Sequence, residues 1–157
     1  GIAVTPIQMA MAISVLANNG ILMKPYVVEK TIDDSGNEHD NTPQEVRRVI
    51  PQEDADTLSQ MLVSVVKNGY DNRAGVKGYF VAGKTGTAQV PNKNGKGYSG
   101  QVMHSFVGYA PAFNPRFLVL FQLNEPHADF ASVTLPPYFK ELAGFILNYY
   151  EVPPDTK

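Results

Sequence analysis

Residues 81–89 constrain the fold most, because they combine the pattern of a strand with side chains that a plain strand lacks. The run reads VAGKTGTAQ and carries one lysine, two threonines and two glycines. Successive strand side chains point to opposite faces, so the threonines share one face and the lysine lies on the other. The two faces hold Thr85, Thr87 and Gln89 on one side and Lys84, Gly86 and Ala88 on the other.

Glycine inside a strand often marks the close approach of a ligand or of another backbone. Here Gly83 and Gly86 flank Lys84 and Thr85. An extended anionic ligand laid along the strand edge would find backbone groups, hydroxyls and a positive charge. An ordinary amphipathic strand is the alternative interpretation, and three residues of Lys-Thr-Gly do not decide between them.

Composition excludes several classes of protein. The chain has 157 residues, enough for one domain with a core, and its 43% hydrophobic and 18% charged content is typical of a globular protein. A net charge of -2 without a Lys/Arg-rich run argues against a nucleic-acid surface. No apolar run reaches the roughly 18 residues that span a bilayer, so we expect no membrane contact in this segment. The chain begins at Gly1 without a signal segment, and we expect it to be a piece of a larger protein.

The chemistry of metals and thiols is not indicated. There is no cysteine, and His39, His104 and His127 lie far apart in the sequence. Without paired ligand spacing we interpret each histidine as a surface or loop residue rather than a ligand. We therefore expect no metal and no cofactor.

Three segments have the spacing of helices. Thr5 and Gln8 form a capping box around Pro6, which predicts a buried helix over residues 6–18. Apolar residues at helical spacing predict a second helix over residues 52–67, and a terminal helix follows Pro136 and Pro137.

The strands are predicted as two hairpins and the 81–89 run. Residues 25–32 and 46–50 should form a polar surface hairpin, and 91–100 a polar loop. Residues 104–110 and 117–123 form a second hairpin, whose later strand is the most apolar run and is expected to be central and covered on both faces. These elements predict an α+β fold, an antiparallel sheet covered by helices.

Four stretches, in this order, resemble the C-terminal part of the transpeptidase domain of class B penicillin-binding proteins. They are residues 1–10 with 17–20, 81–89, 105–111 and 137–143. The Thr-Ala-Gln continuation after Lys-Thr-Gly, and Gln8-Met9-Ala10, are more similar to class B than to class A proteins or serine β-lactamases. The resemblance implies the C-terminal portion of a penicillin-binding, serine β-lactamase-like transpeptidase fold.

The resemblance also implies roles for five residues. Lys84 would hold substrate and poise the proton network of the serine site. The hydroxyls of Thr85 and Thr87 would bind the carboxylate of a D-alanyl-D-alanine stem peptide or of a β-lactam, and the Thr87 backbone N–H would be half of an oxyanion hole. Gly86 would let the ligand backbone approach, and Gln89 would also be a substrate-binding residue.

Two further motifs of that family, Ser-x-x-Lys and Ser-x-Asn, have only weak matches. The candidates are residues 64–67, 35–37 and, more loosely, 70–72. A nucleophilic serine belongs at a helix N-terminus, where its N–H is free, whereas Ser64 falls near the predicted C-terminal end of its helix. Residues 35–37 are explained as a turn. We expect the nucleophile to lie upstream of Gly1 and the segment alone to be inactive.

Residues 1–157 are thus interpreted as the C-terminal segment of a peptidoglycan D,D-transpeptidase domain, which needs the upstream part that holds the nucleophile. The parent would be anchored on the outer side of the cytoplasmic membrane and serve cell division or cell shape. A non-catalytic penicillin-binding sensor or scaffold domain, and a serine β-lactamase, are the alternatives. A sheet short of upstream strands would leave an open edge beside residues 117–123.

Overall fold

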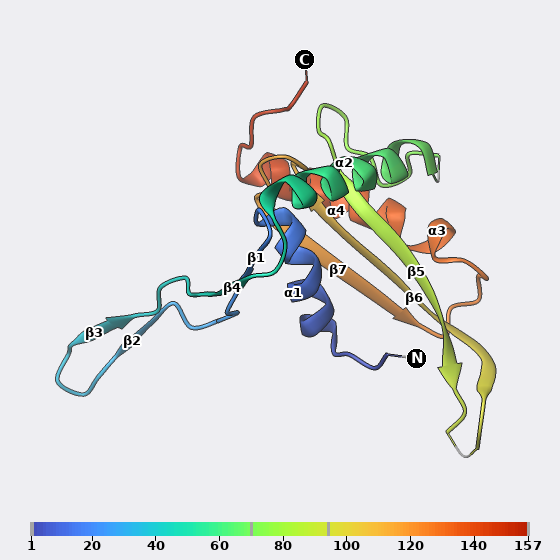
Figure 1. Cartoon of the computed structure of the whole chain (residues 1–157), viewed down its shortest axis with the longest axis horizontal. Helices are drawn as coiled ribbons and strands as arrows, with labels where there is room; N and C mark the ends of the chain where they lie inside the picture. Colours follow the sequence, from blue (N-terminus) through green and yellow to red (C-terminus); the bar gives the residue numbers. More distant parts are fainter. Residues whose placement is uncertain (1, 70, 94, 157) are drawn as a thin grey trace.

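The computed structural model describes residues 2–69, 71–93 and 95–156. Its centre is a three-stranded antiparallel sheet of order β5-β6-β7, with helices on both faces (Figure 1). The strands are β5 (Ala82–Pro91), β6 (Tyr98–Ala110) and β7 (Phe117–Asn124). The predicted α+β architecture is confirmed. Strands β5 and β6 extend further than expected, so the loop between them is shorter than 91–100.

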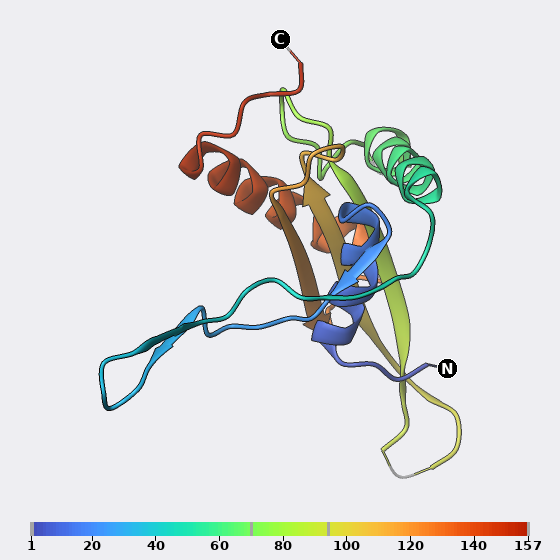
Figure 2. The same ribbon diagram turned by 60° about the vertical axis from the view of Figure 1, so that its left-hand side comes forward.

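Helices cover the sheet from two sides. Helix α4 (Pro136–Tyr149) packs on one face after the short α3 (Ala131–Thr134), while α1 (Pro6–Ala17) lies on the other. Helix α2 (Gln52–Gly69) runs beside β5 on the side away from α4 (Figure 2). All three long helices begin close to where the sequence predicts them.

Helix α1 begins as predicted but is less buried than expected. The Gln8 side chain accepts from the Thr5 N–H at 2.8 Å and the Gln8 N–H donates to the Thr5 hydroxyl at 3.3 Å, which completes the capping box. Only Val15 is buried within the helix, and Ile7 is 57% exposed. The prediction of a buried helix is wrong because capping and periodicity determine that a helix forms, not what covers it.

The capping box gives a first testable effect. Thr5→Ala removes the side-chain acceptor for the Gln8 N–H, and we expect it to destabilise the protein by about 1 kcal/mol. Thermal or urea unfolding of the complete transpeptidase domain measures this loss. Ala3→Ser, at an exposed position two residues before Thr5, is a control that leaves the cap intact. An unchanged unfolding midpoint for Thr5→Ala would show that the cap contributes nothing.

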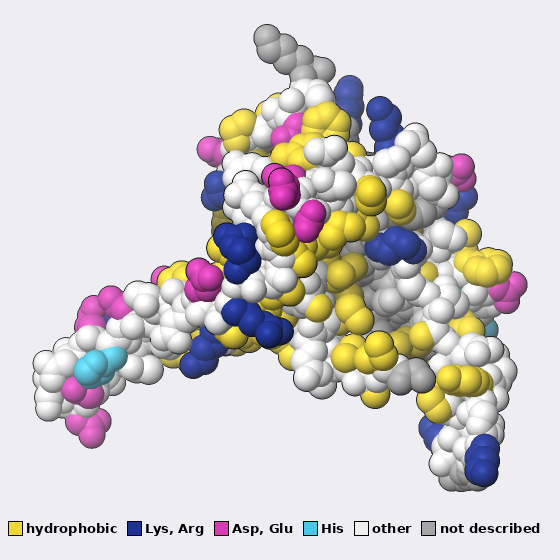
Figure 3. All heavy atoms as spheres, in the orientation of Figure 1, with side chains coloured by type: hydrophobic (Ala, Val, Ile, Leu, Met, Phe, Trp, Pro, Cys, Tyr) yellow, Lys and Arg dark blue, Asp and Glu magenta, His cyan; other side chains and the backbone are white. Residues whose placement is uncertain are grey.

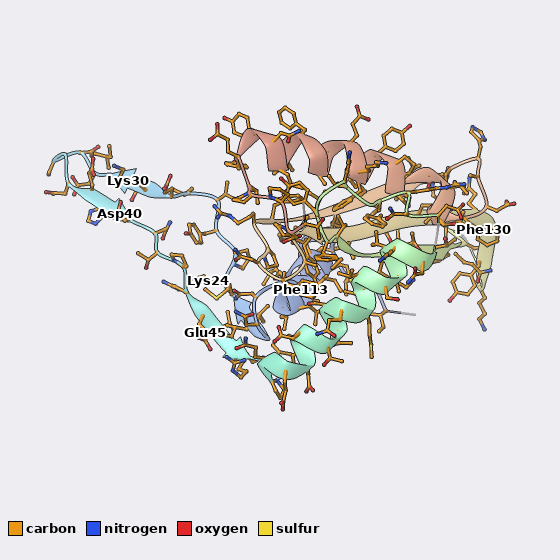
Figure 4. The ribbon with its side chains drawn as sticks, turned by 90° about the horizontal axis from the view of Figure 1, so that it is seen from above. Lys24, Lys30, Asp40, Glu45, Phe113 and Phe130 are labelled. Carbon is orange, nitrogen blue, oxygen red and sulfur yellow. The ribbon has the colours of Figure 1, made fainter. Side chains whose placement is uncertain are left out.

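The polar hairpin projects from the body as an arm (Figures 1 and 4). At its base β1 (Ile21–Met23) pairs with β4 (Glu45–Arg48), and further out β2 (Lys30–Ile32) pairs with β3 (Glu38–Asp40). A projecting polar hairpin is confirmed, but its predicted strands are wrong. Residues 24–29 lie outside any strand, and β2 pairs with β3. The return strand predicted at 46–50 corresponds to β4, which pairs with β1 and not with 25–32. At the tip, hydrogen bonds from Asn37 hold the pKa of Asp33 below its ordinary value.

The most buried strand is β6, not β7. Residues 106–110 are all buried, whereas β7 is half-buried and lies at the end of the sheet. The prediction that 117–123 is central is therefore wrong, and those residues form the terminal strand of the described sheet. Gly108 explains the difference, because a Cβ there would lie 2.8 Å from the Phe139 ring of α4. Close helix packing on β6 needs a glycine, which lowers the apparent apolarity of the most buried strand.

Candidate functional site

The candidate site lies along the outer edge of β5. This strand pairs with β6 on one side and with no other strand in the described part of the chain. Lys84 is paired with Val107, and Thr87 with His104. Lys84 and Val107 face α1 and α2, with which they line a common cavity, whereas Thr87 faces α3, with which it hydrogen-bonds. The predicted division of the two faces is confirmed.

Lys84 lies in an apolar setting. Its ammonium group donates to the Thr85 carbonyl oxygen at 2.9 Å and the side chain remains exposed. The cavity it borders has a volume of about 260 Å³ and is lined almost entirely by carbon, including Ile13 of α1 and Leu62 of α2. Figure 3 shows hydrophobic side chains gathered on this side of the molecule. Lys84 therefore places a solvent-exposed positive charge at the border of an apolar cavity.

The two threonines have different partners. The Thr87 hydroxyl oxygen accepts from the Ala131 N–H, at the start of α3, at 3.2 Å. The Thr85 hydroxyl makes no hydrogen bond with any residue that the structure describes. Because the Thr87 oxygen already accepts, its own hydrogen is directed elsewhere, and the exposed side chain can donate it to a ligand.

The glycines of β5 have packing reasons within the chain. A Cβ on Gly83 would lie 2.7 Å from the Phe106 ring, and one on Gly86 would lie 2.6 Å from the Ser105 hydroxyl oxygen. Glycine at 83 is thus required by the core. At 86 the Ser105 side chain accounts for the glycine, and room for a ligand at that position stays a prediction. Gln89, paired with Val102, is exposed farther along the same strand.

His104 is the residue of this region that sequence reasoning missed. We predicted a surface or loop residue, but the side chain is fully buried on β6. Its Nδ1 lies 3.0 Å from the Thr134 hydroxyl oxygen, and its Nε2 has no partner among the described residues. Strand alternation places His104 on the same face of β6 as the buried Phe106, and this signal of burial is present in the sequence. The pairing with Thr87 is not, because the register between two strands cannot be read from the sequence.

The weak motif matches lie where turns and a helix end explain them. Ser64 is in the C-terminal third of α2, exposed, and its hydroxyl accepts from the Asn68 amide at 3.1 Å. Residues 35–37 belong to the turn at the arm tip, where Asp33 accepts from the Ser35 and Asn37 N–H groups. Of the third match, Tyr70 lies outside the described residues.

Neither a metal centre nor a membrane-spanning helix is found in the part of the chain that the structure describes. Residues 2–69, 71–93 and 95–156 contain no cluster of three His, Asp or Glu side chains that could hold a metal ion. Within the same ranges no helix has the length and apolarity needed to cross a membrane.

Relatives of this chain are found among cell-wall enzymes. The Mycolicibacterium smegmatis penicillin-binding protein PbpB is 35% identical over 98% of this chain and 25% of its own length. The probable peptidoglycan D,D-transpeptidase PenA of Neisseria flavescens is 32% identical over 98% of this chain and 36% of its own length. The chain therefore spans only about a quarter to a third of these relatives.

Solved structures agree with the sequence relatives. Penicillin-binding protein 3 of Mycobacterium tuberculosis, complexed with ampicillin, superposes with a TM-score of 0.89 at 31% identity over 100% of this chain and 37% of its own. The transpeptidase domain of Burkholderia pseudomallei penicillin-binding protein 3 gives 0.79 at 33% identity, over 98% of this chain and 45% of its own. The family model for the penicillin binding protein transpeptidase domain matches residues 1–143. The chain therefore belongs to the penicillin-binding protein transpeptidase family and corresponds to a portion of the class B transpeptidase domain.

Proposed function

We propose that this chain is the substrate-binding portion of a peptidoglycan D,D-transpeptidase. The observation behind the proposal is the outer edge of β5, where Lys84 and the two threonine hydroxyls flank a strand edge that no described strand occupies. A stem peptide ending in D-alanyl-D-alanine, or a β-lactam, would bind in extended form along this edge.

Each residue would contribute a separate interaction. The Thr87 hydroxyl, held as an acceptor by the Ala131 N–H, would donate to the ligand carboxylate, and Thr85 would donate beside it. Lys84 would supply positive potential and poise the proton network of the serine. The Thr87 backbone N–H would donate to the oxyanion, an interaction worth on the order of a hundredfold to a thousandfold in rate.

The nucleophile would come from a part of the parent outside residues 1–157. Ser64 cannot act as one, because near the C-terminal end of α2 its N–H belongs to the helix ladder and the helix dipole has the wrong sign. The parent serine would attack the stem-peptide carbonyl, release the terminal D-alanine, and pass the acyl group to a neighbouring amine. Nucleophile and base act as a unit, so this segment alone would be inactive.

The cellular setting follows from the same proposal. The relative from Mycobacterium tuberculosis has been crystallised with ampicillin and with aztreonam, which supports β-lactams as ligands of this edge. The parent would lie on the outer side of the cytoplasmic membrane, anchored by a segment outside this chain, and would cross-link peptidoglycan for cell division or cell shape. It would need no cofactor.

Intact-mass analysis after incubation with benzylpenicillin tests the proposal. We expect one covalent adduct on the complete parent protein and none on the 157-residue chain, because the nucleophile is absent from the chain. An adduct on the chain, mapped to Ser64, would contradict the assignment of the nucleophile. A parent that forms no adduct would contradict the function, and rapid loss of the adduct by hydrolysis would favour a β-lactamase.

A further inference from the structure

A closed ring of contacts joins β5, β6 and α3 behind the candidate site. His104 on β6 contacts the Thr134 hydroxyl, which donates to the Ala131 carbonyl oxygen at 3.3 Å. The Ala131 N–H donates to the Thr87 hydroxyl on β5, and Thr87 is the cross-strand partner of His104. The ring of contacts therefore connects a buried imidazole with a hydroxyl of the proposed ligand site.

The Thr134 hydroxyl links this imidazole to α3. It lies 3.0 Å from the His104 Nδ1 and 3.3 Å from the Ala131 carbonyl oxygen. A hydroxyl has one hydrogen to donate and can also accept, so it can hold both contacts at once. The other ring nitrogen, Nε2, is fully buried and has no partner among the described residues.

Stability alone does not account for a histidine at this position. A buried polar atom without a partner costs free energy, and such groups are rare enough to call for a specific explanation. A leucine would fill similar space without an unpaired polar atom. What the imidazole supplies here, and a leucine would not, is the Nδ1 contact that holds Thr134, and through it α3.

The orientation of the Thr87 hydroxyl depends on α3. Its oxygen accepts from the Ala131 N–H, which occupies one lone pair and turns the hydroxyl hydrogen away from α3. Helix α3 has only four residues and no side-chain cap at its start, so its own hydrogen bonds hold it weakly. The His104–Thr134 bond is an additional restraint on the N–H that orients Thr87.

We infer that His104 is a positioning residue, which acts through Thr134 and Ala131 to aim the Thr87 hydroxyl at the ligand carboxylate. This inference rests on the proposed function. A hydrogen bond to a charged group that loses its orientation weakens strongly, so we expect His104→Leu to lower the second-order rate constant of acylation by benzylpenicillin about tenfold.

The experiment uses the complete parent protein and stopped-flow acylation, which separates binding from the acylation step. His104→Leu and Thr134→Val should each give about a tenfold loss, mainly in binding, because the carboxylate contact is affected. His104→Asn keeps an N–H donor close to the position of Nδ1 and should recover most of the loss. In a Thr87→Val background, His104→Leu should cause no further loss, because both changes remove the same interaction.

A matched control distinguishes positioning from stability. Tyr79→Phe breaks another tertiary hydrogen bond, which the Tyr79 hydroxyl donates to the Val152 carbonyl oxygen at 2.5 Å, outside the cavity beside Lys84. We expect it to lower the melting temperature and leave acylation unchanged. The inference would be overturned if His104→Leu and Thr134→Val are acylated at the wild-type rate. It would also be overturned if the losses from His104→Leu and Thr87→Val add in the double variant. If His104→Leu does not fold, Thr134→Val decides alone. A wild-type parent that does not react would contradict the proposed function, and this inference with it.

Discussion

Replacing Lys84 by alanine in the complete parent protein should slow acylation by benzylpenicillin at least about a hundredfold, the lower end of what a positioned proton-transfer group contributes. The loss follows from the place of the side chain. It is the cation on β5, beside the two threonines of the proposed site, and it borders a cavity lined almost entirely by carbon. No neighbouring β5 side chain can replace this charge.

The measurement is the rate of adduct formation by intact mass or with a fluorescent penicillin. Lys77→Ala is the matched control, since Lys77 is also exposed but precedes β5 outside the proposed site. It removes the same charge and should leave the rate within about twofold, since exposed charges at a distance are screened. Equal rates for Lys84→Ala and the wild type would remove Lys84 from the site.

The placement of the candidate site residues on the two faces of β5 could be predicted from sequence because a strand has a period of two. Alternation alone placed Lys84 on one face and Thr85 and Thr87 on the other, and the pairing with Val107 and His104 confirms it. Alternation carries no information about what covers each face. The apolar cavity beside Lys84 and the Ala131 contact of Thr87 are formed by helices far away in the sequence.

The wrong predictions about burial share one physical cause, which is that tertiary packing decides which residues are buried. Strand β7 has the most continuous apolar run but lies at the end of the described sheet, whereas β6 is buried with a histidine and a glycine in it. Gly108 is small so that Phe139 can approach, and His104 is buried because Thr134 partners it. By hydropathy both residues would be expected at the surface, although the close packing of β6 depends on each of them.

Gly20 ends a helix, which is a local role, but the structure also gives it tertiary contacts that the sequence does not indicate. A glycine just after a helix is typical of a helix end, and the structure places Gly20 at φ +83 with its N–H donating to the Val15 carbonyl oxygen at 2.8 Å. Its own carbonyl oxygen accepts from the Val49 N–H at 2.8 Å, so Gly20 also joins the end of α1 to the chain leading into α2. Helix end, arm base and α2 therefore meet at a backbone without a side chain.

We expect Gly20→Ala to destabilise the transpeptidase domain by about 3 kcal/mol or more. A left-handed conformation costs an alanine about 1–2 kcal/mol. The added Cβ would also overlap the Ile50 carbonyl oxygen, a backbone atom that cannot move without breaking the contacts at Val49.

Gly36→Ala is the matched control. Gly36 has the same φ of +83, but a Cβ there meets nothing within 4 Å. It isolates the backbone strain, so a loss of about 1–2 kcal/mol is expected. Urea unfolding of the complete domain measures both variants. If the two substitutions lower the free energy of unfolding equally, the overlap at Ile50 contributes nothing and Gly20 only terminates a helix. If Gly20→Ala lowers it by at least about 1 kcal/mol more than Gly36→Ala, the close packing of Gly20 joins α1 to α2.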